Sequence, residues 1–100
     1  MMRIVFSALA ERDLEEIADY IAEDNPQRAA TFIAELRVHG RTIAAAPLAW
    51  PARPELGAGI RASLHGRYVI FFREDAGHLL IVRILHGARD LSAQFGGTPE

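Results

Sequence analysis

The sequence predicts an α+β domain in which a helical hairpin packs on one face of a mainly antiparallel sheet, in the order β-α-α-β-β-β. Apolar residues recur at helical spacing in the first half of the chain, and β-branched and aromatic runs fill the second half. A proline-rich segment separates the two halves. With 100 residues, half of them hydrophobic, we expect a single domain over residues 1–95 and a flexible tail over residues 96–100.

A short strand and two helices are expected before residue 46. Residues 3–6 form a β-branched and aromatic run, and Ser7 can cap a helix over about residues 8–23. Asn25 suits the cap of the second helix, and Pro26 suits its first position, where no N–H is needed. The minimal loop between the helices folds them into a hairpin. The helix residues expected in the core are Leu14, Ile17, Ile21, Phe32, Ile33 and Leu36, and the facing strand residues include Ile70, Phe72 and Ile84.

Three strands are expected after an irregular connection. Residues 47–54 contain three prolines, so we predict a segment without regular structure that passes over the edge of the sheet. The strands are expected at residues 60–64, 68–73 and 79–85, with a glycine-containing hairpin loop at 74–78. The last strand is so continuously apolar that we place it centrally. The second face of the sheet is expected to be partly open, because no further helix remains to cover it.

The composition excludes several classes of function. There is no cysteine, which excludes disulfides, thiolate catalysis and cysteine-ligated zinc, and all 11 basic residues are arginines, which excludes a catalytic lysine. The net charge of −2 argues against nucleic-acid binding by the whole surface. No apolar run suits a signal peptide or a membrane span, so we expect a cytoplasmic protein with no membrane association.

The usual signatures of catalysis and cofactor binding are also missing. No glycine-rich phosphate loop precedes a helix, and no serine has the context of a nucleophile elbow. The four histidines, His39, His65, His78 and His86, fall in four different predicted elements, so a metal site would need long-range convergence. We therefore expect no catalytic residue, no metal, no cofactor and no small-molecule substrate.

Arginines inside apolar strands are the remaining candidates. Arg83 must point to the open face or pair with a carboxylate such as Asp90, because burying it unpaired would be costly. One interpretation is an anion-facing cluster on the open sheet face; the other is a paired or snorkelling side chain with a structural role. Tyr68 could donate to a ligand or could be a core residue with a polar tip. The candidate target-binding residues are Arg61, Arg83 and Arg89, followed by Arg67, Arg73 and Tyr68.

Four segments of the chain together resemble ParE toxins, members of the RelE/ParE superfamily of toxin–antitoxin systems. They are residues 13–22 (DLEEIADYIA), Asn25-Pro26 with Ala29, residues 61–73 (RASLHGRYVIFFR) and residues 82–91 (VRILHGARDL). The resemblance covers nearly the whole chain in the same order. It implies the fold predicted above, DNA gyrase as the target, and a ParD-like antitoxin whose disordered tail folds onto the toxin in a heterotetramer or larger complex.

The related RelE toxins imply an alternative, because they cleave mRNA on the ribosome with basic residues and usually a C-terminal tyrosine. Arg61 and Arg83 match two of the basic positions, but the lysines are absent, and the sequence after Arg83 has Phe95 and no tyrosine. The usual groups for acid–base help are therefore missing. The resemblance favours a non-catalytic gyrase inhibitor, with a ribosome-dependent mRNA endonuclease and a non-toxic antitoxin-binding module as alternatives.

Overall fold

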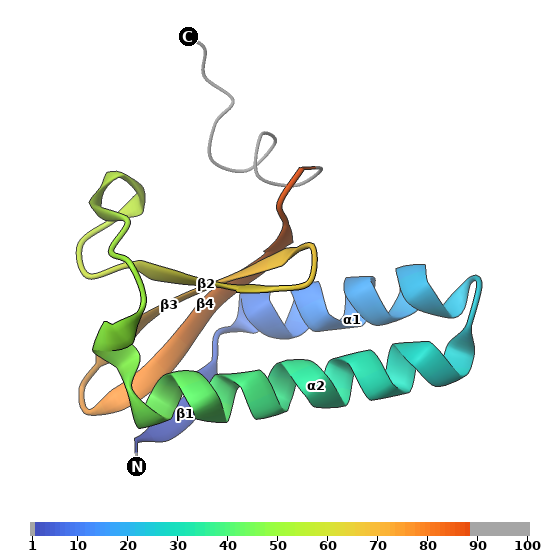
Figure 1. The fold of residues 1–100 in the computed structure, drawn as a ribbon, viewed down its shortest axis with the longest axis horizontal. Helices are drawn as coiled ribbons and strands as arrows, with labels where there is room; N and C mark the ends of the chain where they lie inside the picture. Colours follow the sequence, from blue (N-terminus) through green and yellow to red (C-terminus); the bar gives the residue numbers. More distant parts are fainter. Residues whose placement is uncertain (1, 89–100) are drawn as a thin grey trace, which may run out of the picture.

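A computed structural model describes residues 2–88 and confirms the predicted α+β order. The sheet has the strand order β1-β4-β3-β2, in which β1 runs parallel to β4 and the other neighbours are antiparallel. Both helices lie on one side of it (Figure 1). Residues 96–100, predicted to be a flexible tail, lie outside the described residues. The elements are β1 (Arg3–Phe6), α1 (Ala8–Ala22), α2 (Pro26–Ala45), β2 (Arg61–His65), β3 (Tyr68–Asp75) and β4 (His78–His86).

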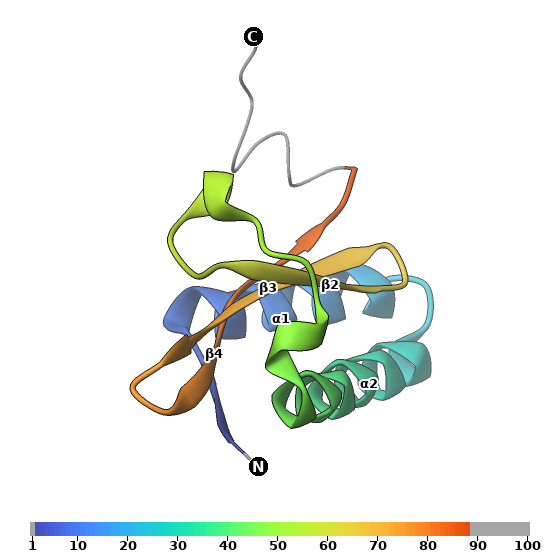
Figure 2. The same cartoon turned by 60° about the vertical axis from the view of Figure 1, so that its left-hand side comes forward.

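Both helices begin at the residues that the sequence indicates. The backbone N–H of Ala10 donates to Ser7 Oγ over 3.0 Å, and the N–H of Arg28 donates to Asn25 Oδ1 over 3.0 Å. Each side chain thereby satisfies an N–H that has no partner inside its own helix. Pro26 occupies the first turn of α2, as expected. The helices run back along each other beneath the sheet (Figure 2), which confirms the hairpin.

The main core forms where the helical stripes meet the sheet. Ile21 and Ile33, which were also expected there, are partly buried and pack against it. Burial of apolar side chains at this junction is the main stabilising contribution to the fold. The predicted core residues that are buried in this cluster are Leu14, Ile17, Phe32, Leu36, Ile70, Phe72 and Ile84.

The second face of the sheet is filled to a greater extent than predicted. Ile60, Ala62, Val69, Phe71 and Leu85 form a second apolar cluster there, each at most 8% exposed. The connection after α2 contains two 3-10 turns, Pro47–Ala49 and Pro54–Leu56, and it crosses from the helix side to this face (Figure 1). Leu56 packs against the cluster. The expectation of an open face is therefore wrong for its centre, because the connection covers more than the sheet edge.

The β3–β4 hairpin has a tighter turn than predicted. β3 extends to Asp75 and β4 begins at His78, so the loop contains two residues in place of the predicted five. Ala76 and Gly77 have φ angles of 52° and 83°. Positive φ at both central residues is typical of the two-residue hairpin turn that matches the twist of the flanking strands. Glycine relieves the strain of this conformation at the second position.

Replacing Leu36 with alanine tests the packing of α2 on the sheet. Leu36 is 1% exposed, so Leu36→Ala leaves a cavity and should lower the free energy of unfolding by roughly 2–5 kcal/mol. Leu9→Ala on α1 is the matched control, because Leu9 is 51% exposed and its replacement should change stability by less than about 1 kcal/mol. Urea denaturation of both variants measures the difference. Equal losses in the two variants would contradict the described core.

Candidate functional site

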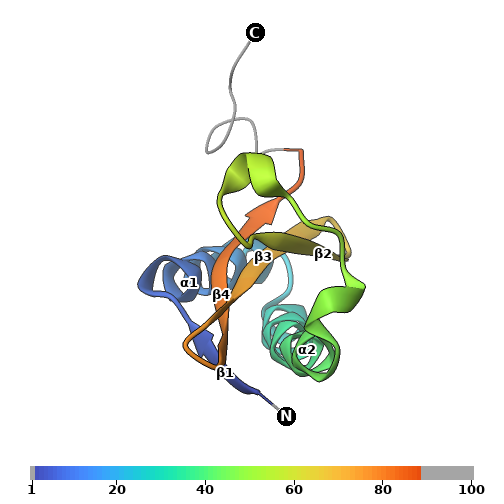
Figure 3. The same cartoon turned by 90° about the vertical axis from the view of Figure 1, so that its left-hand side faces the viewer.

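In the part of the chain that the structure describes, the second half of β4 lacks a strand neighbour on its outer edge, and α1 takes that place. β1 ends at Phe6, opposite Ile81. Beyond this point the Ser7 N–H donates to the Ile81 carbonyl over 3.0 Å, and Ser7 Oγ–H donates to the Val82 carbonyl over 2.7 Å. Figure 3 shows α1 beside β4. The start of α1 therefore satisfies polar backbone groups that would otherwise be unpaired at a sheet edge.

Arg83, a first-choice target-binding candidate, is engaged in a buried ion pair with this helix. Its Nε donates to Asp13 Oδ2 over 2.8 Å and its Nη2 donates to Asp13 Oδ1 over 2.9 Å. The Ile84 N–H also donates to Asp13 Oδ2, over 2.9 Å. The side chains of Arg83 and Asp13 are 17% and 7% exposed. Of the two alternatives that the sequence left open for Arg83, the structure shows pairing with a carboxylate, with Asp13 as the partner. Asp90, the carboxylate suggested by the sequence, lies outside the described residues.

A β-bulge decides which face each of these residues occupies. Phe71 is opposite Arg83 and Phe72 is opposite Ile81, so Val82 is an extra residue on β4. The bulge reverses the alternation of side chains beyond it. Ile84 consequently joins the main core, while Arg83 lies across from Phe71 of the second cluster. Without the bulge, Arg83 and Ile84 would exchange faces.

Arg61 and Arg73 border one hollow, which Arg83 does not line. This hollow has a volume of about 180 Å³. Arg61 Nη1 donates to the Trp50 carbonyl over 2.7 Å, which ties the connection to the start of β2. Arg61 is opposite Phe72, a residue of the main core, so it faces the helix side. The predicted cluster of Arg61, Arg73 and Arg83 on the open face is therefore not formed.

Arg67 and Tyr68 meet at a second hollow of about 300 Å³, where the β2–β3 turn approaches the ends of both helices. Tyr68 is buried, and its ring centroid lies 5.5 Å from that of Phe32 and 5.3 Å from that of His86. These contacts agree with the interpretation of Tyr68 as a core residue. Arg67 is exposed, and among the described residues no carboxylate forms an ion pair with it. The sixth candidate, Arg89, lies outside the described residues.

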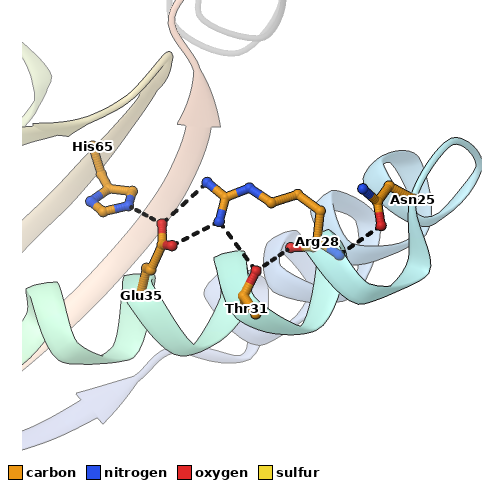
Figure 4. A network of polar contacts seen from close by, with 5 residues as sticks. All are labelled: Asn25, Arg28, Thr31, Glu35 and His65. Atoms are coloured by element: carbon orange, nitrogen blue, oxygen red, sulfur yellow. Dashed lines mark hydrogen bonds and ion pairs between the residues drawn. The ribbon is translucent and has the colours of Figure 1, made fainter.

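A polar chain between α2 and β2 was missed by the sequence reasoning. His39 Nε2 lies 2.7 Å from Ser63 Oγ, and His39 Nδ1 lies 3.3 Å from His65 Nδ1. His65 Nε2 lies 3.4 Å from Glu35 Oε1, and Glu35 forms an ion pair with Arg28 over 2.7 Å (Figure 4). Glu35 and His39 are four residues apart and so share one helix face, a signal visible in the sequence. Their partners on β2 could not be read from spacing.

Two members of the polar chain, Glu35 and His39, have pKa values lowered by their surroundings. The pKa of Glu35 is lowered by hydrogen bonding from Arg28 and then from His65. The pKa of His39 is lowered first by burial, which disfavours the charged ring, and second by the nearby His65. A hollow of about 370 Å³ beside the chain is lined by Ala34, Glu35, Val38, His39, Thr42 and His65.

Among residues 2–88, no group of three or more histidine or carboxylate side chains is arranged to hold a metal ion. Within the same range, no helix is long and apolar enough to cross a lipid bilayer.

Replacing Asp13 with alanine tests its structural role. Asp13→Ala leaves the Arg83 guanidinium and the Ile84 N–H without their buried acceptor, so we expect the free energy of unfolding to fall by roughly 3–5 kcal/mol. Asp19→Ala is the matched control, because Asp19 is an exposed acid on the same helix and its loss should matter by less than about 1 kcal/mol. Thermal and urea unfolding measure both variants. If Asp13→Ala is as stable as Asp19→Ala, the ion pair contributes little to the fold.

The fold has known relatives among solved structures. The chain superposes on the chromosomal ParDE TA system from P. aeruginosa with a TM-score of 0.72 and 21% identity, covering 86% of this chain and 96% of that chain. It superposes on the toxin–antitoxin complex RelBE2 from Mycobacterium tuberculosis with a TM-score of 0.63 and 24% identity, covering 85% and 96%. At these identities the similarity establishes the fold. A comparison with curated proteins gave no significant match.

The sequence also matches a family model described as the ParE toxin of the type II toxin–antitoxin system parDE, over residues 4–91. The match extends from β1 through β4 and includes the segments that resembled ParE toxins. Because it spans most of the sequence, the chain belongs to the ParE toxin family of type II toxin–antitoxin systems.

Proposed function

We propose that this chain is a toxin that inhibits DNA gyrase without catalytic activity of its own. The observation that carries the proposal is the ParE toxin match over residues 4–91. Inhibition of a large protein–DNA assembly requires a binding surface and no proton transfer by the toxin. Side chains that supply charge and shape at the surface are sufficient for such a role.

The hydrogen bonds made by the arginines in the strands favour this proposal over mRNA cleavage. Arg83 is held by Asp13, and Arg61 donates to the Trp50 carbonyl. A guanidinium stays protonated and cannot act as a general base. The sequence has no lysine, and no tyrosine follows Arg83. The groups expected of the nuclease alternative are thus either absent from the sequence or engaged in structural contacts.

Arg67 is the residue most available for contact with the target. It is exposed in the β2–β3 turn and borders the hollow of about 300 Å³ that Tyr68 also lines. An exposed guanidinium can make bidentate contacts with carboxylates or phosphates. Arg73 is the second choice, because it is also exposed. Target binding by Arg61 and Arg83 stays a prediction.

An assay of gyrase supercoiling with Arg67→Ala tests the proposed target and surface together. The unmodified toxin should leave plasmid DNA relaxed or cleaved, and loss of one charged contact of about 1.4 kcal/mol should raise the inhibitory concentration about tenfold. Arg41→Ala is the control, because Arg41 is exposed on α2, away from the β2–β3 turn. Codon-linked mRNA cleavage on ribosomes, with gyrase unaffected, would establish the nuclease alternative. Equal inhibition by both variants would exclude Arg67 as a contact.

We infer that a ParD-like antitoxin neutralises the toxin by binding along β2 and α2. Within residues 2–88, β2 is an edge strand, and only its first residues have an outer neighbour. They reach it through the bridge of Ala52 to Arg61 and the bond of the Ala62 N–H to the Pro51 carbonyl. The hollow of about 370 Å³ lies beside it, next to the exposed Val38. A free edge accepts an added strand, and an apolar hollow accepts the face of a helix. A disordered segment could occupy both by folding on binding.

Placing a charge in the hollow tests antitoxin binding. Val38→Glu should weaken binding of the small protein encoded next to the toxin by at least about tenfold, because a carboxylate would be desolvated at the interface. Leu9→Glu is the control, since Leu9 is equally exposed on the other helix. Isothermal titration measures affinity, and native mass spectrometry measures stoichiometry. The antitoxin proposal fails if the unmodified pair does not bind at micromolar concentration; the location fails if both variants bind equally.

A further inference from the structure

The polar chain between α2 and β2 has a defined direction of hydrogen bonding. The Glu35 carboxylate, which Arg28 keeps ionised, can only accept, so His65 Nε2–H donates to it. The Nδ1 of a neutral His65 then accepts from His39 Nδ1–H. His39 Nε2 is left as an acceptor for Ser63 Oγ–H. One tautomer of each ring therefore satisfies every link.

The same chain can accept one proton and remain intact. If His65 is protonated beside Glu35, both of its ring nitrogens donate. His39 then adopts its other tautomer, in which Nδ1 accepts from His65 and Nε2–H donates to Ser63 Oγ. Every contact survives, since the serine hydroxyl can either donate or accept. The added charge is also compensated by Glu35.

A second proton breaks the chain. With both imidazoles charged, two N–H groups would face each other across the 3.3 Å between His39 Nδ1 and His65 Nδ1. The second charge would also be placed on His39, where burial disfavours the charged ring, next to Ser63, which is only 2% exposed. The two rings must then separate. Because His39 lies on α2 and His65 lies on β2, their separation breaks a contact that joins these two elements.

Few other ionisable groups face the chain. Arg28 forms an ion pair with Glu35, and Tyr68 of β3 is the register partner of His65. On the side of α2 that faces α1, Arg37 pairs with Glu11 instead. Glu35 has its pKa lowered, so it stays ionised while the histidines titrate.

We propose that Ser63, His39, His65 and Glu35 form a proton-controlled latch that holds the edge strand β2 against α2. The latch is closed with no proton or one proton on the two imidazoles, and it opens in mild acid when the second proton binds. Opening exposes Ser63 and widens the hollow beside Val38 and Thr42. The ligand of this site is the proton itself, and the site regulates access to one edge of the sheet.

The sign of the effect follows from the depressed pKa of His39. A histidine that is harder to protonate in the folded chain stabilises the fold at pH values above its unfolded pKa of about 6.5. That contribution is lost as the pH falls through the folded pKa. The latch should therefore be closed at neutral pH and should weaken progressively below about pH 6.5.

The free toxin, His39→Gln and His78→Gln are compared by urea denaturation at about pH 7.5 and about pH 5. His78 is the matched control, because it lies at the β3–β4 turn, beside the Asp75 carbonyl and away from the chain. We expect acidification to lower the folding equilibrium constant of the unmodified toxin and His78→Gln about threefold more than that of His39→Gln. Equal acid losses in all three proteins would overturn the proposal.

Two measurements on the unmodified toxin keep the test decisive if His39→Gln does not fold. In an NMR titration of the imidazole signals, the His39 signal should titrate below the ordinary histidine range. Hydrogen-exchange protection of the β2 amides should fall in acid before that of the β4 amides. Titration of His39 within the ordinary histidine range, or uniform loss of protection across the sheet, would show that no latch exists.

Discussion

The buried Asp13 carboxylate is the contact on which the rest of the fold depends. It accepts from the Arg83 guanidinium through both oxygens and from the Ile84 N–H, so one side chain joins α1 to the unpaired part of β4. Low exposure makes these hydrogen bonds strong and makes the loss of either partner costly. The short length of β1 creates the requirement, because among residues 2–88 no strand lies on the outer edge of β4 beyond Ile81, while the other edge pairs with β3.

The bulge at Val82 links this ion pair to the two apolar clusters. It places Ile84 in the core between the helices and the sheet, and it places Arg83 across from Phe71, on the side of the second cluster. The same displacement brings the Ile84 N–H into reach of Asp13. One extra residue therefore sets the ion pair, the backbone contact with Asp13 and the packing of both faces of the sheet.

The polar residues of the domain divide into those used for architecture and those left at the surface. Arg61 and Arg83 hold the connection and α1 in place, whereas Arg67 and Arg73 are exposed. Recognition of partners is therefore expected at the β2–β3 turn and along β2, where the sheet edge is largely free. The histidine chain lies at the same edge, so the proposed latch and the surface proposed for binding share one part of the sheet.

Local chemistry in the sequence determined the elements and their order. Ser7 and Asn25-Pro26 specify the helix starts, and the spacing of Leu14, Ile17, Phe32 and Leu36 specifies the buried faces, because caps and periodicity act within a few residues. For the candidate site, the sequence determined only which types of residue were available and not how they are arranged. The partner of Arg83, the face of Arg61, the course of the proline-rich connection and the meeting of His39 with His65 were decided by the tertiary structure. Each joins residues at least 11 positions apart, or depends on the bulge, and neither a long-range contact nor a one-residue slip in strand register leaves a periodic signal in the sequence.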